Sequence, residues 1–248
     1  MAQMNKANRE NPVSAGGSGR VALVTGGSRG IGRAVALRLA ALGFSVAICG
    51  RDESALEEAR REISHSGTRV LSLSLDVTNS KKVTAAVRQV EEAFGSIHVL
   101  VNSAGIGGFG PAHEQSEADW DRVLDTNLKS VFLLSRAVAP SMIQRGSGDI
   151  INISSLAGHS AFAGGGLYCA SKWGLQGLSA CMAEDLRERG VRVSVISPGS
   201  VATGFSGRGL KDPAKTLAAE DVAHAVATIV TQSPQSFVSE IQLRPLRK

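Results

Sequence analysis

Short runs rich in β-branched residues alternate with helix-length segments along this chain from Arg20 onward. Such alternation predicts a parallel sheet covered by helices on both faces, and right-handed crossovers make that sheet doubly wound. The expected strands cover residues 21–26, 45–49, 70–75, 98–102, 149–154 and 191–197, with a last strand near the C-terminus. Residues 34–42, 53–64 and 83–94 show helical spacing of apolar side chains. We therefore expect an α/β protein with a single-domain Rossmann fold and a seven-stranded parallel sheet.

The length of 248 residues suits one such domain, which we place at residues 20–248. Residues 1–19 are rich in Asn, Ser and Gly and lack the apolar segment of a secretory signal, so a disordered tail is expected there. No apolar run approaches the roughly 18 residues of a membrane helix. The sequence predicts a soluble protein that has no membrane partner.

Charge and cysteine content limit the partners further. The net charge of +5 favours an anionic ligand, but the basic residues are dispersed, so no nucleic-acid partner is expected. Cys49, Cys169 and Cys181 form no CxxC pair and are too few for a disulfide framework. We expect a cytoplasmic protein with no metal site.

A glycine-rich stretch, "VALVTGGSRGIG", leads from the first expected strand into a helix. Glycines at this junction let backbone amides and the positive helix end approach a pyrophosphate closely. The stretch therefore predicts a dinucleotide site. Its candidate contacts are Gly26, Ser28, Arg29, Gly30, Ile31 and Gly32.

The end of the second expected strand indicates which dinucleotide binds. An acidic residue about 20 positions after the glycine loop binds the ribose of NAD, whereas an Arg there accommodates the 2′-phosphate of NADP. Arg51 follows Gly32 by 19 positions, and Arg29 is a second cation for the same group. Asp52 is contrary evidence unless it caps the next helix. We expect NADP(H).

Tyr168 is the only tyrosine of the chain and precedes Lys172 by four positions, one helical turn. This spacing has two interpretations. The pair could be a half-buried phenol beside an ordinary helical neighbour. Alternatively, the ammonium stabilises the phenolate and lowers a pKa that is otherwise near 10.

Three separated motifs resemble one known family. They are "TGGSRGIG", "NSAG" at residues 102–105 and "YCASK" at residues 168–172. From about residue 20 to 238 the chain resembles the short-chain dehydrogenase/reductase family, and most closely its 3-oxoacyl-[acyl-carrier-protein] reductases and related carbonyl reductases. The resemblance favours the catalytic interpretation of the tyrosine.

The resemblance also assigns roles. Tyr168 matches the proton donor, and Lys172 the residue that lowers its pKa and binds the nicotinamide ribose. Ser155, rather than its neighbour Ser154, matches the serine that orients the substrate carbonyl, and Asn127 matches the anchor of a proton-relay water. Tyr168 and Lys172 count among the cofactor contacts too. The further cofactor contacts implied are Asp76, Val77, Asn102, Ala104, Gly105, Pro198, Gly199, Val201 and Thr203.

The implied activity is reduction of a ketone to a secondary alcohol with NADPH. The best match is a 3-oxoacyl-[acyl-carrier-protein] reductase, and the alternatives are a carbonyl reductase or alcohol dehydrogenase on another small molecule and a non-catalytic NADP-binding regulator. Intact catalytic positions argue against the regulator. The sequence departs from the family pattern at two places. Ser103 replaces a second Asn, for which we expect a structural effect only. The C-terminus lacks Asp-Gly-Gly, and this departure puts the substrate and the subunit contacts in doubt.

Two further features of the sequence indicate possible partners. Arg187 and Arg189, with Arg145 as a weaker candidate, are either a docking surface for an acidic acyl carrier protein or solvated cations at helix ends. The apolar helices expected near residues 127–144 and 166–187 predict a homo-oligomer, a tetramer or a dimer.

The glycine-rich loop from 198 to about 219 is either a mobile lid or a long connection.

Overall fold

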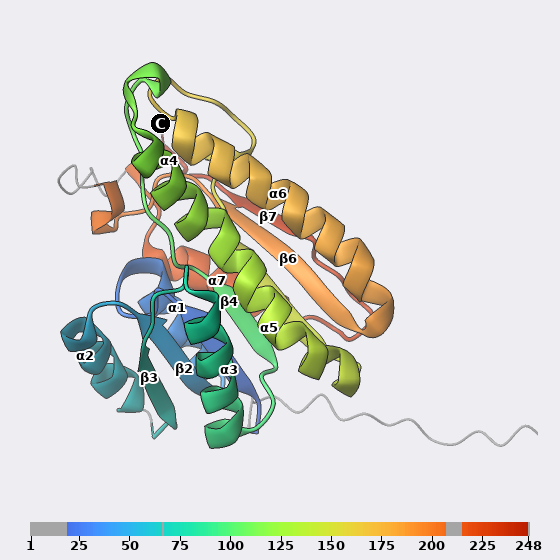
Figure 1. Ribbon diagram of the computed structural model, residues 1–248. Coiled ribbons are helices and arrows are strands. Elements are labelled where there is room, and N and C mark those ends of the chain that lie inside the picture. Colours follow the sequence, from blue (N-terminus) through green and yellow to red (C-terminus); the bar gives the residue numbers. More distant parts are fainter. Residues whose placement is uncertain (1–18, 66, 207–214, 248) are drawn as a thin grey trace, which may run out of the picture.

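The computed structural model describes residues 19–65, 67–206 and 215–247 (Figure 1). All seven strands lie in one parallel sheet with the order β3-β2-β1-β4-β5-β6-β7. The strands are β1 (Val21–Thr25), β2 (Ser45–Gly50), β3 (Val70–Ser74), β4 (Val99–Asn102), β5 (Gly148–Ile153), β6 (Val191–Pro198) and β7 (Glu240–Leu243). The predicted fold class and the last strand are confirmed. Most of the expected tail and residues 207–214 of the expected lid lie outside the described residues.

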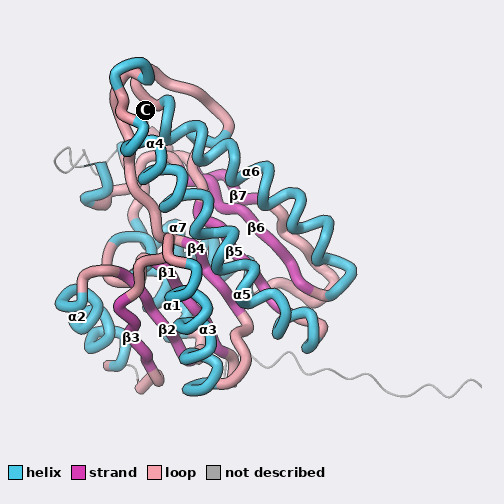
Figure 2. The backbone as a smooth tube through the Cα atoms, in the orientation of Figure 1, coloured by secondary structure: helices cyan, strands magenta, loops and turns pink. Residues whose placement is uncertain are grey.

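Helices cover both faces of this sheet (Figures 1 and 2). One face carries α1 (Gly30–Ala41), α2 (Glu53–Ser64) and α7 (Ala219–Val230). The other carries α3 (Ser80–Phe94), α5 (Ser130–Arg145) and α6 (Gly166–Leu186), and the short α4 (Glu117–Leu124) precedes α5 and contacts α6. The fold is thus doubly wound.

Each face of the sheet has its own apolar core. One core joins Leu39 of α1, Ile48 of β2 and Val226 of α7, and the other joins Leu134 of α5 with Ile150 of β5. Because helices bury both faces, β1 is buried at all five positions of its "VALVT" sequence, four of which are apolar.

The strand order places the functional crevice. The chain runs outward from β1 through β2 to β3 and then returns to build β4 to β7 on the other side of β1. Ligands of doubly wound proteins bind where the order reverses, at the carboxyl ends of the strands. That point lies between β1 and β4.

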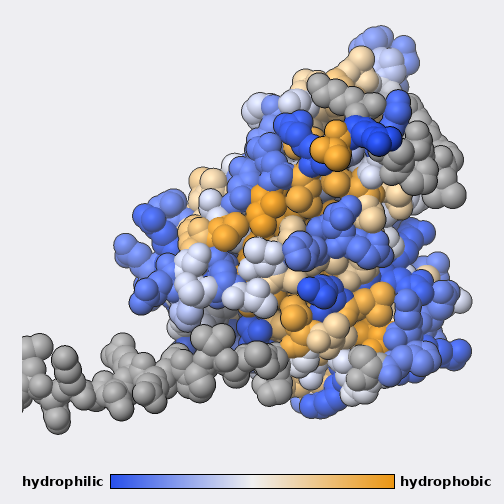
Figure 3. All heavy atoms as spheres, turned by 180° about the vertical axis from the view of Figure 1, so that it is seen from behind, coloured by the Kyte–Doolittle hydropathy of each residue, from blue (hydrophilic) through white to orange (hydrophobic). Residues whose placement is uncertain are grey.

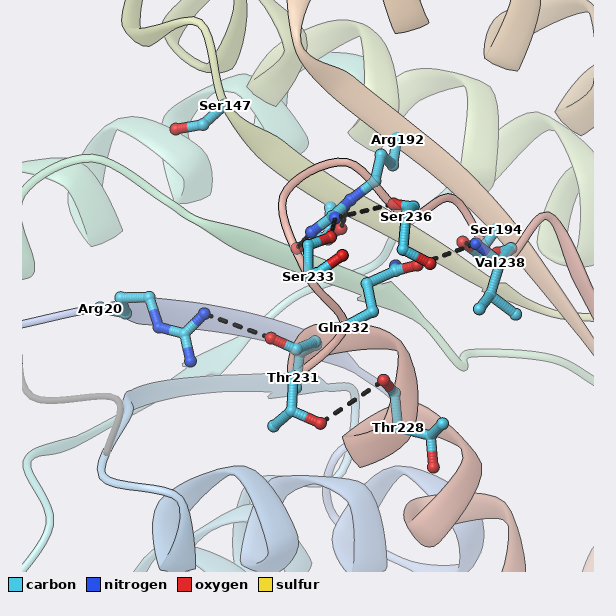
Figure 4. A network of polar contacts seen from close by, with 12 residues as sticks. Arg20, Ser147, Arg192, Ser194, Thr228, Thr231, Gln232, Ser233, Ser236 and Val238 are labelled. Carbon is cyan, nitrogen blue, oxygen red and sulfur yellow. Dashed lines mark hydrogen bonds and ion pairs between the residues drawn. The ribbon is translucent and has the colours of Figure 1, made fainter. Parts of the chain in front are cut away.

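The edge strand β7 is fixed by the segment that leads into it (Figure 4). Nη1 of Arg192 on β6 donates to the carbonyl oxygens of Ser233 and Ser236, each at 3.2 Å. Oγ of Ser194 donates to the Val238 carbonyl at 2.6 Å. These contacts hold the connection between α7 and β7 against the neighbouring strand.

The back of the molecule shows hydrophobic patches between hydrophilic side chains (Figure 3). Within residues 19–65, 67–206 and 215–247, no helix is long and apolar enough to cross a membrane.

Candidate active site

A cavity of about 1590 Å³ opens at the carboxyl ends of the strands. Its wall combines the glycine loop after β1, the ends of β2 and β3, the loop after β4, the start of α6 and the segment after β6. These are the parts of the fold that the sequence analysis assigned to cofactor and substrate.

The glycine loop forms a cradle for an anion. Gly26 has φ +65°, and a Cβ there would lie 3.0 Å from Cα of Ala104. A Cβ on Gly32 would lie 2.2 Å from the Gly26 carbonyl oxygen, so the close turn into α1 needs glycine at both positions.

The first turn of α1 is free to bind that anion. Among the residues that the structure describes, no side chain caps α1, and its first turn has no acidic residue, whereas Asp52 caps α2 and Asn79 caps α3. Amides left without a partner at a positive helix end fit a pyrophosphate. The cradle and the uncapped helix therefore fit the predicted dinucleotide.

Thr25 at the end of β1 ties this cradle to the loop after β4. Its Oγ1 accepts hydrogen bonds from the amides of Ser103 and Ala104, both at 3.0 Å. The two sides of the crevice therefore keep a fixed spacing.

The polar residues after β2 and β3 lie together at one end of the cavity. The exposed Arg51 lines it, and Asp52 Oδ1 accepts from the Ala55 amide at 3.0 Å, which confirms Asp52 as a helix cap. Asp76 accepts from the Thr78 amide and hydroxyl, at 3.0 and 2.8 Å. These bonds, with the nearby Arg51 charge, lower the pKa of Asp76. Arg51 is left available for a phosphate.

Tyr168, Ser155 and Lys172 meet at the wall of the cavity. Tyr168 on α6 is buried and is hydrogen-bonded to Ser155, which follows β5. Nζ of Lys172 donates to the Ile153 carbonyl at 2.9 Å and lies 5.8 Å from the centroid of the Tyr168 ring. Ser154 is buried and accepts a long hydrogen bond from Gln176 instead. The structure thus brings Ser155, not Ser154, to the phenol.

Burial controls the protonation of this pair. It raises the pKa of Tyr168, while the hydrogen bond with Ser155 acts in the opposite direction. Burial also lowers the pKa of Lys172 to about 8. The sequence predicted that the ammonium of Lys172 lowers the pKa of the phenol. Desolvation instead has the largest effect on the pKa of Tyr168 and raises it. Nζ of Lys172 donates its hydrogen bond to the Ile153 carbonyl. Tyr168 therefore carries its proton at neutral pH.

Asn127 lies in a π-helical turn, Asp125–Lys129, between α4 and α5. Its Nδ2 donates to the Ile106 carbonyl at 2.9 Å and to Ser171 Oγ at 3.0 Å, and its Oδ1 accepts from the Ile106 amide at 2.8 Å. Asn127 is buried behind the cavity wall and holds the loop after β4 against α6. The role of Asn127 as the anchor of a proton-relay water stays a prediction. The sequence did not indicate the widened turn, which is a frequent feature of functional sites.

Asn102 is placed differently from the prediction. Its Nδ2 donates to Asn152 Oδ1 at 2.9 Å, and Asn152 Nδ2 donates to Ser179 Oγ at 2.9 Å. This buried chain links β4, β5 and α6 and does not reach the cavity. The other predicted cofactor residues all line the cavity: Gly26, Ser28, Arg29, Gly30, Ile31, Gly32, Arg51, Asp76, Val77, Ala104, Gly105, Tyr168, Lys172, Pro198, Gly199, Val201 and Thr203.

Sequence reasoning missed a polar cluster formed with the segment that follows Ser155. Nε2 of His159 lies 2.7 Å from Glu240 Oε1 on β7 and 3.3 Å from Ser197 Oγ on β6. Gln176 on α6 also reaches His159 and Ser197, at 2.7 and 2.9 Å. The cluster joins β7, β6 and α6 to the segment after Ser155. The unusual C-terminal sequence was its only signal.

The aromatic residues around Tyr168 were missed as well. Phe109, Phe162 and Phe205 line the cavity, and the rings of Phe109 and Phe205 lie 5.4 and 5.9 Å from that of Tyr168. Phe109 and Phe162 stand in "GIGGFGP" and "SAFAGGG". A large ring among glycines was a signal that could have identified both.

Comparisons with known proteins identify the family of this chain. A family model described as short chain dehydrogenase matches residues 20–214. An uncharacterised oxidoreductase of Staphylococcus saprophyticus is 38% identical over 92% of this chain and 97% of its own. A 3-oxoacyl-[acyl-carrier-protein] reductase of Staphylococcus aureus is 40% identical over 73% of this chain and 74% of its own.

Among solved structures, a metagenomic short-chain oxidoreductase in complex with NADP has a TM-score of 0.82 and 44% identity, covering 92% of this chain and 98% of its own. The chain belongs to the short-chain dehydrogenase family. It is an NAD(P)-dependent oxidoreductase.

Proposed function

We propose that this enzyme reduces a ketone to a secondary alcohol with NADPH. The observation that carries the proposal is the buried phenol of Tyr168, hydrogen-bonded to Ser155 at the cavity wall and one helical turn from the buried Lys172. A protonated phenol that faces a ligand cavity is a suitable general acid for a carbonyl oxygen.

The roles of the chain's own groups follow from this geometry. Ser155 Oγ orients the carbonyl oxygen, and Tyr168 Oη transfers its proton to that oxygen. Lys172, whose pKa is about 8, carries a positive charge at neutral pH that stabilises the phenolate left behind. Arg29 and the first amides of α1 would hold the pyrophosphate. The nicotinamide cofactor supplies the hydride when it is bound.

Three observations support NADPH over NADH. Arg51 lines the cavity at the end of β2, and the neighbouring carboxylate of Asp52 is occupied as a helix cap. A planar guanidinium suits the 2′-phosphate. The solved relative of 44% identity carries NADP.

The natural substrate is a 3-oxoacyl thioester or another small ketone. The Staphylococcus aureus relative favours the thioester, although it matches only 74% of its own length. Docking of an acyl carrier protein would fall to Arg187 and Arg189. Arg145 is less suitable, because its Nη2 donates to the carbonyl oxygens of Ile97 and Ser147.

We also propose a cytoplasmic homotetramer or dimer assembled through α5 and α6. Phe132 on α5 and Trp173 on α6 are 44% and 52% exposed, and burial of these side chains against a second copy would be favourable.

A cofactor-oxidation assay tests the proposed reaction. We expect the protein to oxidise NADPH with simple ketones, and Tyr168→Phe to lose about 10²–10⁴ in turnover while its affinity for NADPH changes little. Binding of NADPH to the variant, followed by fluorescence, is the control for correct folding. Near-normal turnover by Tyr168→Phe would contradict the assigned proton donor.

A further inference from the structure

We propose that the ketone carries an aryl or similarly flat apolar group, which binds against Phe109 and Phe162. We call these two side chains the aromatic wall. This inference rests on the proposed ketone reduction and specifies the substrate of the same site.

The aromatic wall continues directly from the proposed proton donor. The Phe109 ring lies 5.4 Å from the Tyr168 ring at an angle of 57°, and the Phe162 ring lies 6.2 Å from Phe109 at 46°. Separations of 4.5–7 Å with tilted planes are the favourable geometry for aromatic contacts. A carbonyl at Tyr168 would therefore place its substituent along a row of ring faces and edges.

Glycines on the same loops set the position of both rings. A Cβ on Gly107 would lie 2.6 Å from Cε2 of Phe109, and a Cβ on Gly165 would lie 2.6 Å from Cζ of Phe162. Each ring therefore packs directly against the backbone of a glycine, in space that the Cβ of any other residue would occupy. These contacts fix the positions of the two rings.

A hydrogen bond joins the two loops that carry the wall. The Gly110 amide donates to the Gly164 carbonyl at 2.8 Å. The loop after β4 and the loop before α6 therefore hold Phe109 and Phe162 in a fixed relation. A surface arranged before the ligand arrives costs less to order on binding.

The exposure of the rings indicates that a ligand covers them. Phe109 is 36% and Phe162 49% exposed, whereas Tyr168 beside them is 9% exposed. Covering such apolar area removes it from water, which is favourable. A polyhydroxylated ketone would instead lose water from its hydroxyl groups against rings that accept no hydrogen bond.

Phe205 does not belong to the aromatic wall. Its Cε2 lies 4.0 Å from a Cβ placed on Gly105, and that same position is 4.0 Å from Nζ of Lys172. Gly105 and Lys172 are predicted cofactor contacts, so Phe205 lies on the cofactor side of the phenol.

Kinetics with matched ketones test the proposal. Acetophenone and cyclohexyl methyl ketone have the same carbon skeleton, but only acetophenone has a flat ring. We expect Phe109→Leu and Phe162→Leu each to lower kcat/KM for acetophenone about tenfold, and to change that for the cyclohexyl ketone about twofold or less. Phe237→Leu, an exposed phenylalanine outside the cavity, is the matched control and should change neither.

Equal losses with both ketones would overturn the proposal, as would a wild-type preference for the N-acetylcysteamine thioester of 3-oxobutanoate or for dihydroxyacetone over acetophenone. Calorimetric binding of 1-phenylethanol separates this inference from the proposed reaction. If the protein reduces no ketone, the proposed function fails. Weaker binding of 1-phenylethanol to Phe109→Leu than to the wild type would still support the aromatic wall, and equal binding to the two proteins would refute it.

Discussion

Replacing Lys172 with methionine should change how the stability of the cofactor-free protein depends on pH. Burial lowers the pKa of this lysine from 10.5 to about 8 in the folded protein. The unfolded chain therefore binds more protons than the folded chain between about pH 8 and 10.5, and wild-type stability gains a contribution that rises with pH across that window. Methionine has no such titration.

The size of the effect follows from the two pKa values. Their difference of about 2.5 corresponds to about 3 kcal/mol that the buried ammonium costs the folded protein at neutral pH. About 2 kcal/mol of this should be recovered between pH 7 and pH 9.5. Loss of the hydrogen bond to the Ile153 carbonyl also affects the variant, but the part of its contribution that varies with pH is already contained in the pKa of Lys172, and the rest cancels in the comparison.

Urea unfolding at fixed protein concentration between pH 7 and 9.5 measures this difference. The free energy of unfolding of the wild type, minus that of Lys172→Met, should rise by about 2 kcal/mol over the interval. Lys81→Met, at an exposed position on α3, should follow the wild-type profile. Cys49, whose pKa burial raises to about 12, is common to all three proteins. Parallel profiles for wild type and Lys172→Met would refute the reasoning.

Two further changes test other parts of the site. Arg51→Asp should weaken NADPH binding at least tenfold and leave NADH binding within about threefold, because it removes a hydrogen-bond donor to the 2′-phosphate and adds a charge of the same sign as the phosphate. Titration with both cofactors measures these affinities. An unchanged preference for NADPH over NADH would exclude Arg51 as the phosphate contact. Glu240→Ala should lower the free energy of unfolding by about 1 kcal/mol, since it leaves His159 and Ser197 without their acceptor, while Glu240→Gln should restore most of the loss. Thermal unfolding of both variants measures this difference in stability. Equal Tm values for Glu240→Ala and Glu240→Gln would show that the hydrogen bonds of residue 240 with His159 and Ser197 contribute nothing.

The fold could be predicted because its signals are local. Apolar strand runs and the glycine loop with its flanking helix are short stretches whose physics depends little on distant residues. The expected strand at residues 45–49 differs from β2 by one residue, and the helix at Glu53–Ser64 has the expected bounds. The motif at Tyr168 and Lys172 was equally local.

Features that depend on contacts between distant segments could not be predicted. Asn102 was assigned to the cofactor because of its motif, yet its register partner across the sheet is Asn152, and the two side-chain amides pair in the buried interior. Phe109 and Phe162 lie 53 positions apart in sequence and meet only because two loops converge. The pKa of Tyr168 depends on burial, which the spacing to Lys172 does not reveal.

The widened turn at Asp125–Lys129 makes the number of residues in this part of the chain a constraint in its own right. Asn127 on the turn is bonded to Ile106 at one side, and Leu134 and Met142 farther along α5 are buried in the core. A π-helical turn holds one residue more than a regular turn, so deleting one residue there would restore a regular helix and leave Leu134 and Met142 close to their present orientation. The residues of the turn itself would shift, and Asn127 would lose its alignment with Ile106 and Ser171. A single-residue deletion at this position should therefore remove the contacts of Asn127 while largely sparing the core.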